Sequence, residues 1–412
     1  MISYSAFREK LGATKRVWSG KESPLERFLK IGTRNPYIAN IVATLATNAT
    51  RNENSPISLE GALDLIRQHQ LDGVIELIGY INAADTWSGG TVRGFYEVGA
   101  YSALCELGIR TKVHTGTSIG AVPATFFAIR MHPSNLQIDT SPQNLENSAF
   151  ELVESLGVRT LYEEPKNLVK RAINRGRKIK LYAKGLVSEG IIDTSGLETF
   201  FQHSFGNLKM GNLPGLYIIA CDYNSNDEGK KVVLSSIKTP DEFIWEALRK
   251  STASPFLFKP YRVDGSAYAD GGLVEVFPCS TAIEDGKADI VIGVLLNYHL
   301  PRIESDFKLP HGKVIQALRN FSIMNSVNLD WVIAYHTGKT PLYVAENGDP
   351  RGRLLLIMPN LSHVAPDDFY GEGPKLIKPG RYETLDAVAK FFSPNFSHLE
   401  YNPEYFLSRF RR

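Results

Sequence analysis

The chain has 412 residues, of which 43% are hydrophobic and 22% are charged, the proportions of an ordinary soluble globular protein. A net charge of +2 is too small to predict nucleic-acid binding. No stretch reaches the ~18 consecutive apolar residues that a membrane-spanning helix needs.

The cysteines and the N-terminus bear on the compartment. Cys105, Cys221 and Cys279 each lie in an apolar stretch, so we expect no disulfide framework and a reducing environment. The first eight residues lack a basic start followed by an apolar run, so we expect no Sec-type signal. These features predict a cytoplasmic protein, either free or associated with a membrane. Export by a route that needs no such signal is also compatible with the sequence.

Residues 1–74 are expected to form a basic helical extension. Up to Arg34 they carry eight basic and three acidic residues, interleaved with aromatic and aliphatic ones. Such a face fits a peripheral contact with an anionic membrane surface. A helical cap docked on the main domain is the simpler interpretation. The segment 58–66 begins with a capping serine and has a helical apolar period.

The next part of the chain predicts a parallel sheet. Residues 74–82 are apolar and β-prone, and we expect this stretch to end in a buried strand. A glycine-rich turn then opens a helix that stops at Gly108. A second strand, turn and helix follow over 111–129. This βαβα order predicts an α/β fold, a three-layer α/β/α sandwich with a largely parallel central sheet.

The remaining elements are more scattered. We expect surface helices with a basic run over 131–200, and strands over 216–222, 231–235 and 288–296. A helix over 243–254, a strand ending at Asp270 and a late strand over 354–358 are also expected. Residues 311–331 have a long helical period, and the tail 386–412 is expected to be helical and separate from a main domain over 75–385.

The turn Gly116-x-Ser118-x-Gly120 is the first candidate for chemistry. A serine on a sharp strand-to-helix corner presents its hydroxyl outward, and flanking glycines keep other side chains away. The amides that open the following helix favour a developing oxyanion. A glycine-rich corner that serves packing alone is the other interpretation.

Asp270 is the candidate base. It ends a strand before Gly271 and Gly272, and a desolvated aspartate can accept a serine proton directly. An ordinary Asp-Gly turn is the structural alternative. None of the nine histidines lies in a distinctive turn. His114 is expected within the strand that leads to Ser118, roughly 13 Å back along it, and so to be a core or strand-end histidine.

The turn at Gly89 and Gly90 is the candidate oxyanion site. In a parallel sheet it lies at the same edge as the Ser118 corner, so free amides of the two turns can converge on one oxygen. A phosphate-binding turn is a rival interpretation. The dinucleotide fingerprint fails because Thr91 stands at its second glycine position.

These motifs, in this order, resemble the patatin-like phospholipase family over roughly residues 75–385. The matching segments are Ser88–Gly94, Gly116–Ala121, Ala253–Phe256, Val263–Gly265, Asp270–Leu273, Ala288–Gly293, Ile357–Leu361, Asp367–Phe369 and Leu376–Gly380. The resemblance implies a Ser-Asp dyad of Ser118 and Asp270, with the amides of Gly89, Gly90 and Thr91 as oxyanion donors.

Two departures from the family pattern bear on activity. Thr91 replaces a usual glycine, and its Cβ disfavours a positive φ. Glu275 follows the Asp270 turn where the family often has asparagine, which places a carboxylate near the site. Arg93, beside Gly94 at a helix start, opposes the helix dipole and should have a partner, either a lipid phosphate or a nearby carboxylate.

The sequence therefore predicts a lipid acyl hydrolase of the phospholipase A or lysophospholipase type, acting on phospholipid or other lipid esters. No metal or cofactor is implied, because no ligand spacing for zinc or calcium occurs. A Ser-His-Asp esterase or thioesterase is one alternative. An inactive module that binds lipid or a partner is another, favoured by Thr91 and Glu275.

Overall fold

The computed structural model describes the central part of the chain and shorter pieces on either side. The described residues are 57–132, 136–157, 192–222, 229–255, 257–296, 354–361 and 368–392, with short pieces at 35, 37–38, 41–42, 44–45, 343–344, 350–351 and 363–364. The predicted basic face of residues 1–34, the basic run within 158–191, the helix over 311–331 and the tail after 392 lie outside them. None of the described helices is long and apolar enough to cross a bilayer.

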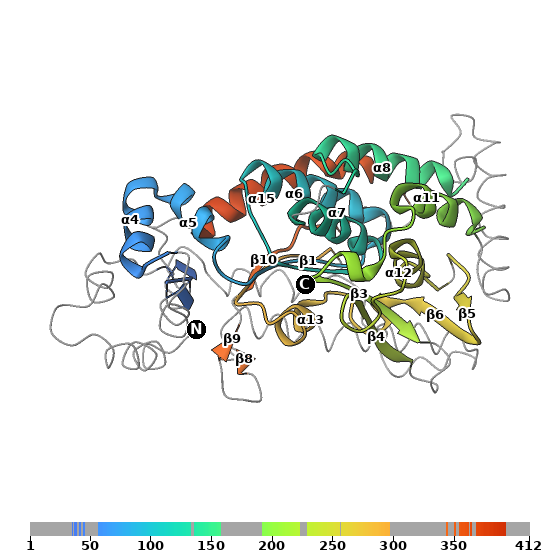
Figure 1. Ribbon diagram of the computed structural model, residues 1–412. Helices are drawn as coiled ribbons and strands as arrows, with labels where there is room; N and C mark the ends of the chain where they lie inside the picture. Colours follow the sequence, from blue (N-terminus) through green and yellow to red (C-terminus); the bar gives the residue numbers. More distant parts are fainter. Residues whose placement is uncertain are drawn as a thin grey trace, which may run out of the picture.

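The fold is α/β, with a mostly parallel eight-stranded sheet, as predicted (Figure 1). The strands lie in the order β10-β7-β1-β2-β3-β6-β5, and β4 pairs with β3. The strand bounds are β1 Ala83–Trp87, β2 Val113–Thr117, β3 Leu216–Asp222, β4 Lys230–Ser235, β5 Tyr261–Val263, β6 Ser266–Asp270, β7 Ile290–Val294 and β10 Leu354–Ile357. A separate pair contains β8 Tyr343–Val344 and β9 Pro350–Arg351.

Helices cover both faces of this sheet. On one face lie α6, α7, α8 and α15, and on the other α13 packs against β1, β2 and β7 (Figure 1). The bounds are α4 Leu59–His69, α5 Leu71–Ile78, α6 Gly94–Glu106, α7 Ala121–Met131, α8 Pro142–Ser155, α11 Ser195–Phe205, α12 Ile244–Ser251, α13 Cys279–Glu284 and α15 Ile377–Phe392. Short 3₁₀ turns are η1 Thr91–Arg93, η2 Ser118–Gly120, η3 Met210–Asn212, η4 Gly271–Leu273 and η5 Pro374–Leu376.

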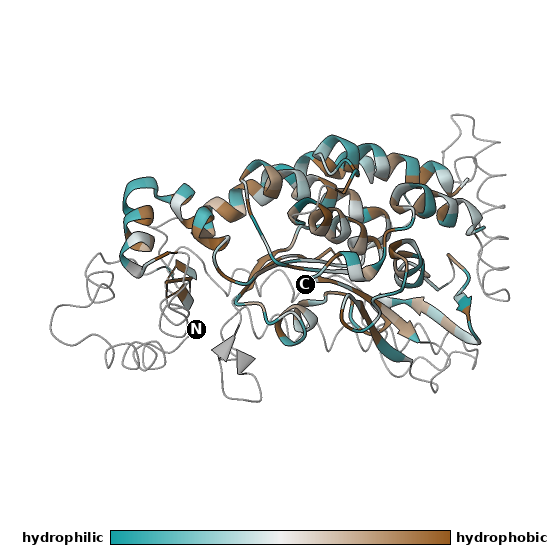
Figure 2. Cartoon of the chain, in the orientation of Figure 1, coloured by the Kyte–Doolittle hydropathy of each residue, from teal (hydrophilic) through white to brown (hydrophobic). Residues whose placement is uncertain are grey.

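The alternation of side chains along the buried strands builds the two halves of the core. In β7, Ile290, Ile292 and Val294 join the larger cluster under α6 and α7, while Val291 joins the cluster under α13. This is the two-residue period of a strand that is buried on both faces. Figure 2 shows the apolar strands between helices whose outer faces are hydrophilic.

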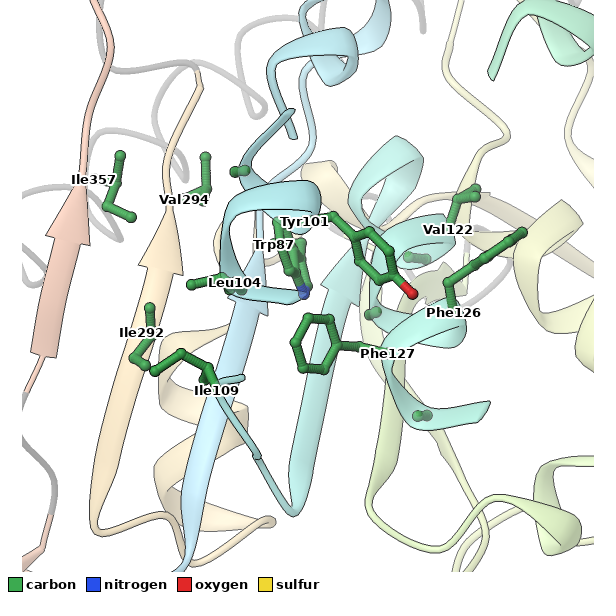
Figure 3. Packing of buried hydrophobic residues seen from close by; sticks show 14 of the residues in the cluster. Trp87, Tyr101, Leu104, Ile109, Val122, Phe126, Phe127, Ile292, Val294 and Ile357 are labelled. Carbon is green, nitrogen blue, oxygen red and sulfur yellow. The ribbon is translucent and has the colours of Figure 1, made fainter. Parts of the chain in front are cut away.

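Aromatic side chains fill the space between α6, α7 and the sheet (Figure 3). The Phe127 ring lies with its centroid 5.2 Å from that of Tyr101, nearly perpendicular to it, and 6.2 Å from that of Trp87. All three side chains are buried. Large rings in such edge contacts fix the height at which α6 and α7 lie above the strands.

One strand was predicted in the wrong place. Residues 71–78 form helix α5, and the first strand is β1, which begins at Ala83. The buried residues of α5 include Val74, Ile75, Leu77 and Ile78. Their spacing fits one face of a helix as well as an apolar strand, so the sequence pattern alone did not distinguish the two. The alanines of β1 carry no strand signal, and its place between β2 and β7 makes it a strand.

Segments on either side of the predicted boundaries pack against the main core. The Asn35 side-chain amide donates to the Phe391 carbonyl over 2.7 Å, and the Tyr37 hydroxyl donates to the Leu354 carbonyl over 3.0 Å. Helix α15 runs across position 385, where we expected the main domain to end, and packs along α6.

The crossing of α6 and α15 depends on two glycines. A Cβ at Gly99 would lie 1.9 Å from the Ile377 carbonyl oxygen, and a Cβ at Gly380 would lie 2.1 Å from the Tyr96 carbonyl oxygen. Both obstacles are backbone atoms that no rotamer change can move. The two helices therefore approach more closely than any other residue would permit.

We expect Gly99→Ala to lower the free energy of unfolding by ~3 kcal/mol, the upper range for overpacking a core. Chemical denaturation measures the change. Gly61→Ala in α4 is the matched control, because its Cβ would meet only the Ile57 and Ser58 side chains, at 3.3 Å. A Gly99→Ala protein as stable as the wild type would contradict the close helix crossing.

Candidate active site

The site forms where two strands of opposite direction share one edge of β3. Strand β2 runs parallel to β3 up to the pair Thr117–Ile219, and β6 runs antiparallel up to the pair Asp270–Ala220. Strand β4 occupies the other edge of β3 over Tyr217–Asp222. The carboxyl ends of β2 and β6 therefore meet head to head, which brings Ser118 next to Asp270 although 152 residues separate them.

Ser118 lies on a strained corner between β2 and α7. Its φ is +54°, a left-handed conformation that is uncommon outside glycine. The Ser251 hydroxyl, at the end of α12, accepts the Ser118 N–H over 2.8 Å and donates to the Ile219 carbonyl over 2.5 Å. Gly120 lies against the backbone of β1, where a Cβ would come within 2.6 Å of the Trp87 carbonyl.

The Ser118 hydroxyl donates to the Asp270 Oδ2 over 2.6 Å. The other carboxylate oxygen accepts the Gly272 N–H over 2.7 Å, which fixes the plane of the group. Only 5% of Asp270 is exposed to solvent. Burial raises the pKa of Asp270 to about 6, against the lowering effect of the two hydrogen bonds. A carboxylate with this pKa can accept a proton near neutral pH.

Gly271 gives the Asp270 turn its close approach to β3. A Cβ at this position would lie 2.1 Å from the Ile219 carbonyl oxygen. Gly116 plays the same part at the other turn, where a Cβ would lie 2.5 Å from the Gly120 carbonyl oxygen. The glycines of both predicted motifs thus allow the two turns to come together.

The turn after β1 lies against Ser118. A Cβ at Gly89 would lie 3.3 Å from the Ser118 Cβ, a contact tight enough to press on the serine. The Gly89 N–H, however, donates to the Val276 carbonyl over 2.9 Å. The prediction that Gly89 supplies an oxyanion donor does not fit this geometry. No described hydrogen bond occupies the amides of Gly90 and Thr91, and these two remain as candidates.

Thr91 has a φ of +49°, the conformation for which a β-branched residue is least suited. Its hydroxyl donates to the Gly90 carbonyl over 2.7 Å, which turns the side chain back on its own turn. Thr91 therefore adopts a conformation that suits glycine, at a cost in backbone strain.

Arg93 and Gly94 have positions that the sequence only partly predicted. The Arg93 guanidinium donates from Nε and from a terminal nitrogen to the Val364 carbonyl, over 3.1 and 2.9 Å. The Val364 carbonyl is thus one partner of Arg93. A Cβ at Gly94 would lie 2.6 Å from the Ile119 side chain, so Gly94 lets α6 begin directly beside the Ser118 corner.

Glu275 points away from the dyad. Its carboxylate accepts hydrogen bonds from Ser280, from the Thr281 N–H over 3.3 Å and from the Thr281 hydroxyl over 2.6 Å. It also forms an ion pair with Lys231 over 2.6 Å. The carboxylate thus caps the start of α13 on the opposite face of the sheet, and only its backbone carbonyl, which accepts the Thr117 hydroxyl, lies near the site.

His114 lies in the core, in accordance with its predicted place in the strand. It is 2% exposed, and its Nδ1 lies 2.6 Å from the Asp85 Oδ1 on the neighbouring strand. The Asp85 carboxylate also accepts the Trp87 indole N–H and the Thr111 hydroxyl. This buried His-Asp pair has its polar atoms engaged with one another, and none of its described hydrogen bonds reaches Ser118.

An apolar cavity opens at Ser118 and was not predicted. It has an empty volume of about 850 Å³, including the part open to solvent, and is lined by the start of α6, by α7, α8 and α11, and by the segment after α12. No described lining residue is charged. The residues that α8 and α11 contribute include Leu145, Ala149, Leu152, Leu197 and Phe201. Their helical spacing indicated burial, but not that the buried face would border a cavity.

The described residues contain no group of three or more His, Cys, Asp and Glu side chains placed to hold a metal ion. The polar groups that meet at the site are the Ser118 hydroxyl, the Asp270 carboxylate and the Gly272 N–H.

Comparison with known proteins matches residues 87–283 to a family described as patatin-like phospholipase. The uncharacterized protein YqhO of Bacillus subtilis is 28% identical over 225 residues, which cover 51% of this chain and 69% of that protein. The intracellular phospholipase A2 of Caenorhabditis elegans is 30% identical over 121 residues, which cover 26% of this chain and only 11% of that protein.

Two solved structures have weaker similarity. VipD from Legionella pneumophila has a TM-score of 0.37 and 16% identity, with 75% of this chain and 66% of that chain covered. ExoU from the type III secretion system of Pseudomonas aeruginosa, solved in complex with SpcU, has a TM-score of 0.30 and 14% identity, with 76% and 53% covered.

The raised pKa of Asp270 predicts a dependence of stability on pH. Because the folded-state pKa of about 6 lies above the ordinary 3.8, the protonated form is favoured by folding. The contribution of Asp270 to stability is complete below pH 4 and is lost as the pH rises through 6. Ionised Asp270 should therefore cost about 3 kcal/mol at pH 8.

We expect Asp270→Asn to gain stability relative to the wild type by up to about 3 kcal/mol between pH 4 and pH 8. Urea denaturation across this range measures the difference. Asp64→Asn, the same change at a half-exposed position of α4, serves as the control. A difference between Asp270→Asn and wild type that stays constant with pH would contradict the raised pKa.

Proposed function

Because residues 87–283 match the patatin-like phospholipase family, we propose that this protein hydrolyses carboxylic esters of lipids, with Ser118 as nucleophile and Asp270 as base. The observation that carries the proposal is the buried 2.6 Å hydrogen bond from the Ser118 hydroxyl to the Asp270 carboxylate. A nucleophile and a base within direct hydrogen-bond reach are the minimum that acyl transfer requires.

In the proposed first step, the Ser118 oxygen attacks the acyl carbonyl while its proton passes to Asp270. The carbonyl oxygen becomes an oxyanion, and the amides of Gly90 and Thr91 donate to it. Asp270 then returns the proton to the leaving alcohol, which leaves an acyl group on Ser118. In the second step Asp270 takes a proton from water, the hydroxide attacks the acyl-enzyme, and the fatty acid leaves as Ser118 regains its proton.

The cavity at Ser118 supports a lipid rather than a small polar substrate. An acyl chain placed there contacts aliphatic and aromatic side chains of α7, α8 and α11. Burying its methylenes contributes ~0.8 kcal/mol each. The substrate class that we propose is therefore a phospholipid or another ester of a long-chain fatty acid, of the phospholipase A or lysophospholipase type.

The described histidines give less support to a Ser-His-Asp arrangement. His114 is engaged with Asp85 inside the sheet. His69, His203 and His363 are exposed to solvent, and His132 is half-buried at the end of α7. The alternative of an inactive binding module was based on Glu275 and Thr91. The Glu275 carboxylate lies on the other face of the sheet, so this residue gives that alternative no support.

We expect Ser118→Ala and Asp270→Asn each to lower kcat by roughly 1,000-fold or more, the scale of a lost catalytic residue. The double variant should be no slower than the slower single one, because the pair acts as a unit. Hydrolysis of a soluble ester measures the rate, and labelling by a fluorophosphonate reports Ser118 directly.

The chain offers a matched control for this experiment. Ser195 and Asp193 form the same hydrogen bond, 2.8 Å from hydroxyl to carboxylate, at the exposed start of α11. Ser195→Ala and Asp193→Asn should keep the wild-type rate. Retention of more than a tenth of the rate by Ser118→Ala or Asp270→Asn would contradict the role of that residue.

The cavity predicts a dependence on acyl length. With a series of p-nitrophenyl esters, kcat/KM should rise by up to about fourfold per methylene until the cavity is full. Ala149→Phe places a ring in the cavity and should end the rise at shorter chains. Glu151→Phe, on the exposed face of α8, is the control. The same length dependence in the Ala149→Phe variant would show that the chain does not enter this cavity.

A further inference from the structure

A fully buried carboxyl group lies directly behind the oxyanion turn. Glu97, in the first turn of α6, is 0% exposed. Its Oε1 accepts the Ser88 N–H over 2.9 Å, and its Oε2 has no hydrogen-bond partner among the described residues. The proposed mechanism makes no use of this group. Desolvating a carboxyl group without a counter-charge is costly, so its retention needs a reason.

The Ser88 amide divides its hydrogen bonding between two acceptors. It also donates to the Val294 carbonyl over 3.2 Å, a bond that continues the ladder between β1 and β7 beyond the pair Trp87–Val294. The shorter bond is the one to Glu97. The amide is therefore shared between the ladder and Glu97 of α6, at the residue directly after the end of β1 at Trp87.

Ser88 also links the two turns of the site. Its Oγ accepts the Leu296 N–H over 2.9 Å. Its carbonyl oxygen lies 2.6 Å from where a Cβ of Gly120 would stand, so it touches the Ser118 corner. Gly89, Gly90 and Thr91 follow at once in the chain. A shift of Ser88 into the ladder would thus move the candidate oxyanion amides relative to the nucleophile.

We infer that Glu97 is a positioning residue that ends β1 at Trp87 and sets the place of the Gly90 and Thr91 amides through its hydrogen bond from Ser88. This inference rests on the proposed function. Glu97 does not touch the substrate, and its effect reaches the oxyanion only through the backbone of the turn.

The protonation state of Glu97 suits this role. Burial raises the pKa of Glu97 well above its ordinary value, and the Ser88 hydrogen bond lowers it by less. This shift favours the neutral acid, which accepts the Ser88 N–H without placing a negative charge behind a developing oxyanion. A glutamine side chain offers the same acceptor at the same distance, whereas a leucine fills the same space with no acceptor.

The test compares Glu97→Leu, Glu97→Gln and Glu97→Asp on a short, soluble ester. We expect Glu97→Leu to lower kcat about 100-fold with KM within about twofold, the cost of displaced oxyanion donors. Glu97→Asp, one methylene too short to reach Ser88, should lose as much. Glu97→Gln should keep kcat within about threefold. Glu106→Leu, the same change at a half-exposed site of α6, is the control and should have the wild-type rate.

A trifluoromethyl ketone that forms an oxyanion on Ser118 supplies the second readout. Its affinity for Glu97→Leu should fall by the same factor as kcat/KM, because both report the oxyanion site. The inference is overturned if kcat of both Glu97→Leu and Glu97→Asp stays within threefold of wild type, if Glu97→Gln is as slow as Glu97→Leu, or if kcat falls while inhibitor affinity does not. Activity that survives Ser118→Ala would instead overturn the proposed function.

Discussion

The site depends on one topological constraint, which is that β2 and β6 approach each other along the same edge of β3. The pairs Thr117–Ile219 and Asp270–Ala220 are adjacent register positions, so the two strands leave no room between their ends. A register slip of one residue in β6 would turn Asp270 to the other face of the sheet. The backbone ladder of β3 therefore determines the distance between the two side chains more than any contact between them does.

The same arrangement places several features that are unfavourable for the free energy of folding in a small volume. A buried carboxylate, two residues at positive φ and several glycines against backbone carbonyls all occur within three turns. The surrounding structure holds them, through the Ser251 hydroxyl at Ser118, the Gly272 amide at Asp270 and the aromatic packing of α6 and α7. Functional sites commonly store strain that a well-packed scaffold supports.

Local chemistry in the sequence predicted more of the site than did patterns of hydrophobicity. The motifs around Ser118 and Asp270 are local patterns of glycine and a polar residue, and a single sequence reveals them, although Gly120 and Gly271 make their close contacts with β1 and β3. The first strand was predicted too early in the chain. The alanines of β1 have little intrinsic preference for a strand, and they adopt one because β1 pairs with β2 and β7. The engaged amide of Gly89, the contact of Arg93 with Val364 and the position of Glu97 depend on segments about 10 to 270 residues away, and no local pattern encodes them.

The position of β7 has a consequence for anyone who divides this chain into fragments. The matched family segment ends at residue 283, whereas β7 and β10 come after it and β7 pairs with β1 along its whole length. A fragment cut at that point would leave β1 as an open edge, with unpaired backbone donors and acceptors beside an apolar face. Such edges recruit strands from other chains. Such a fragment would therefore contain a sheet with an exposed, aggregation-prone edge at β1.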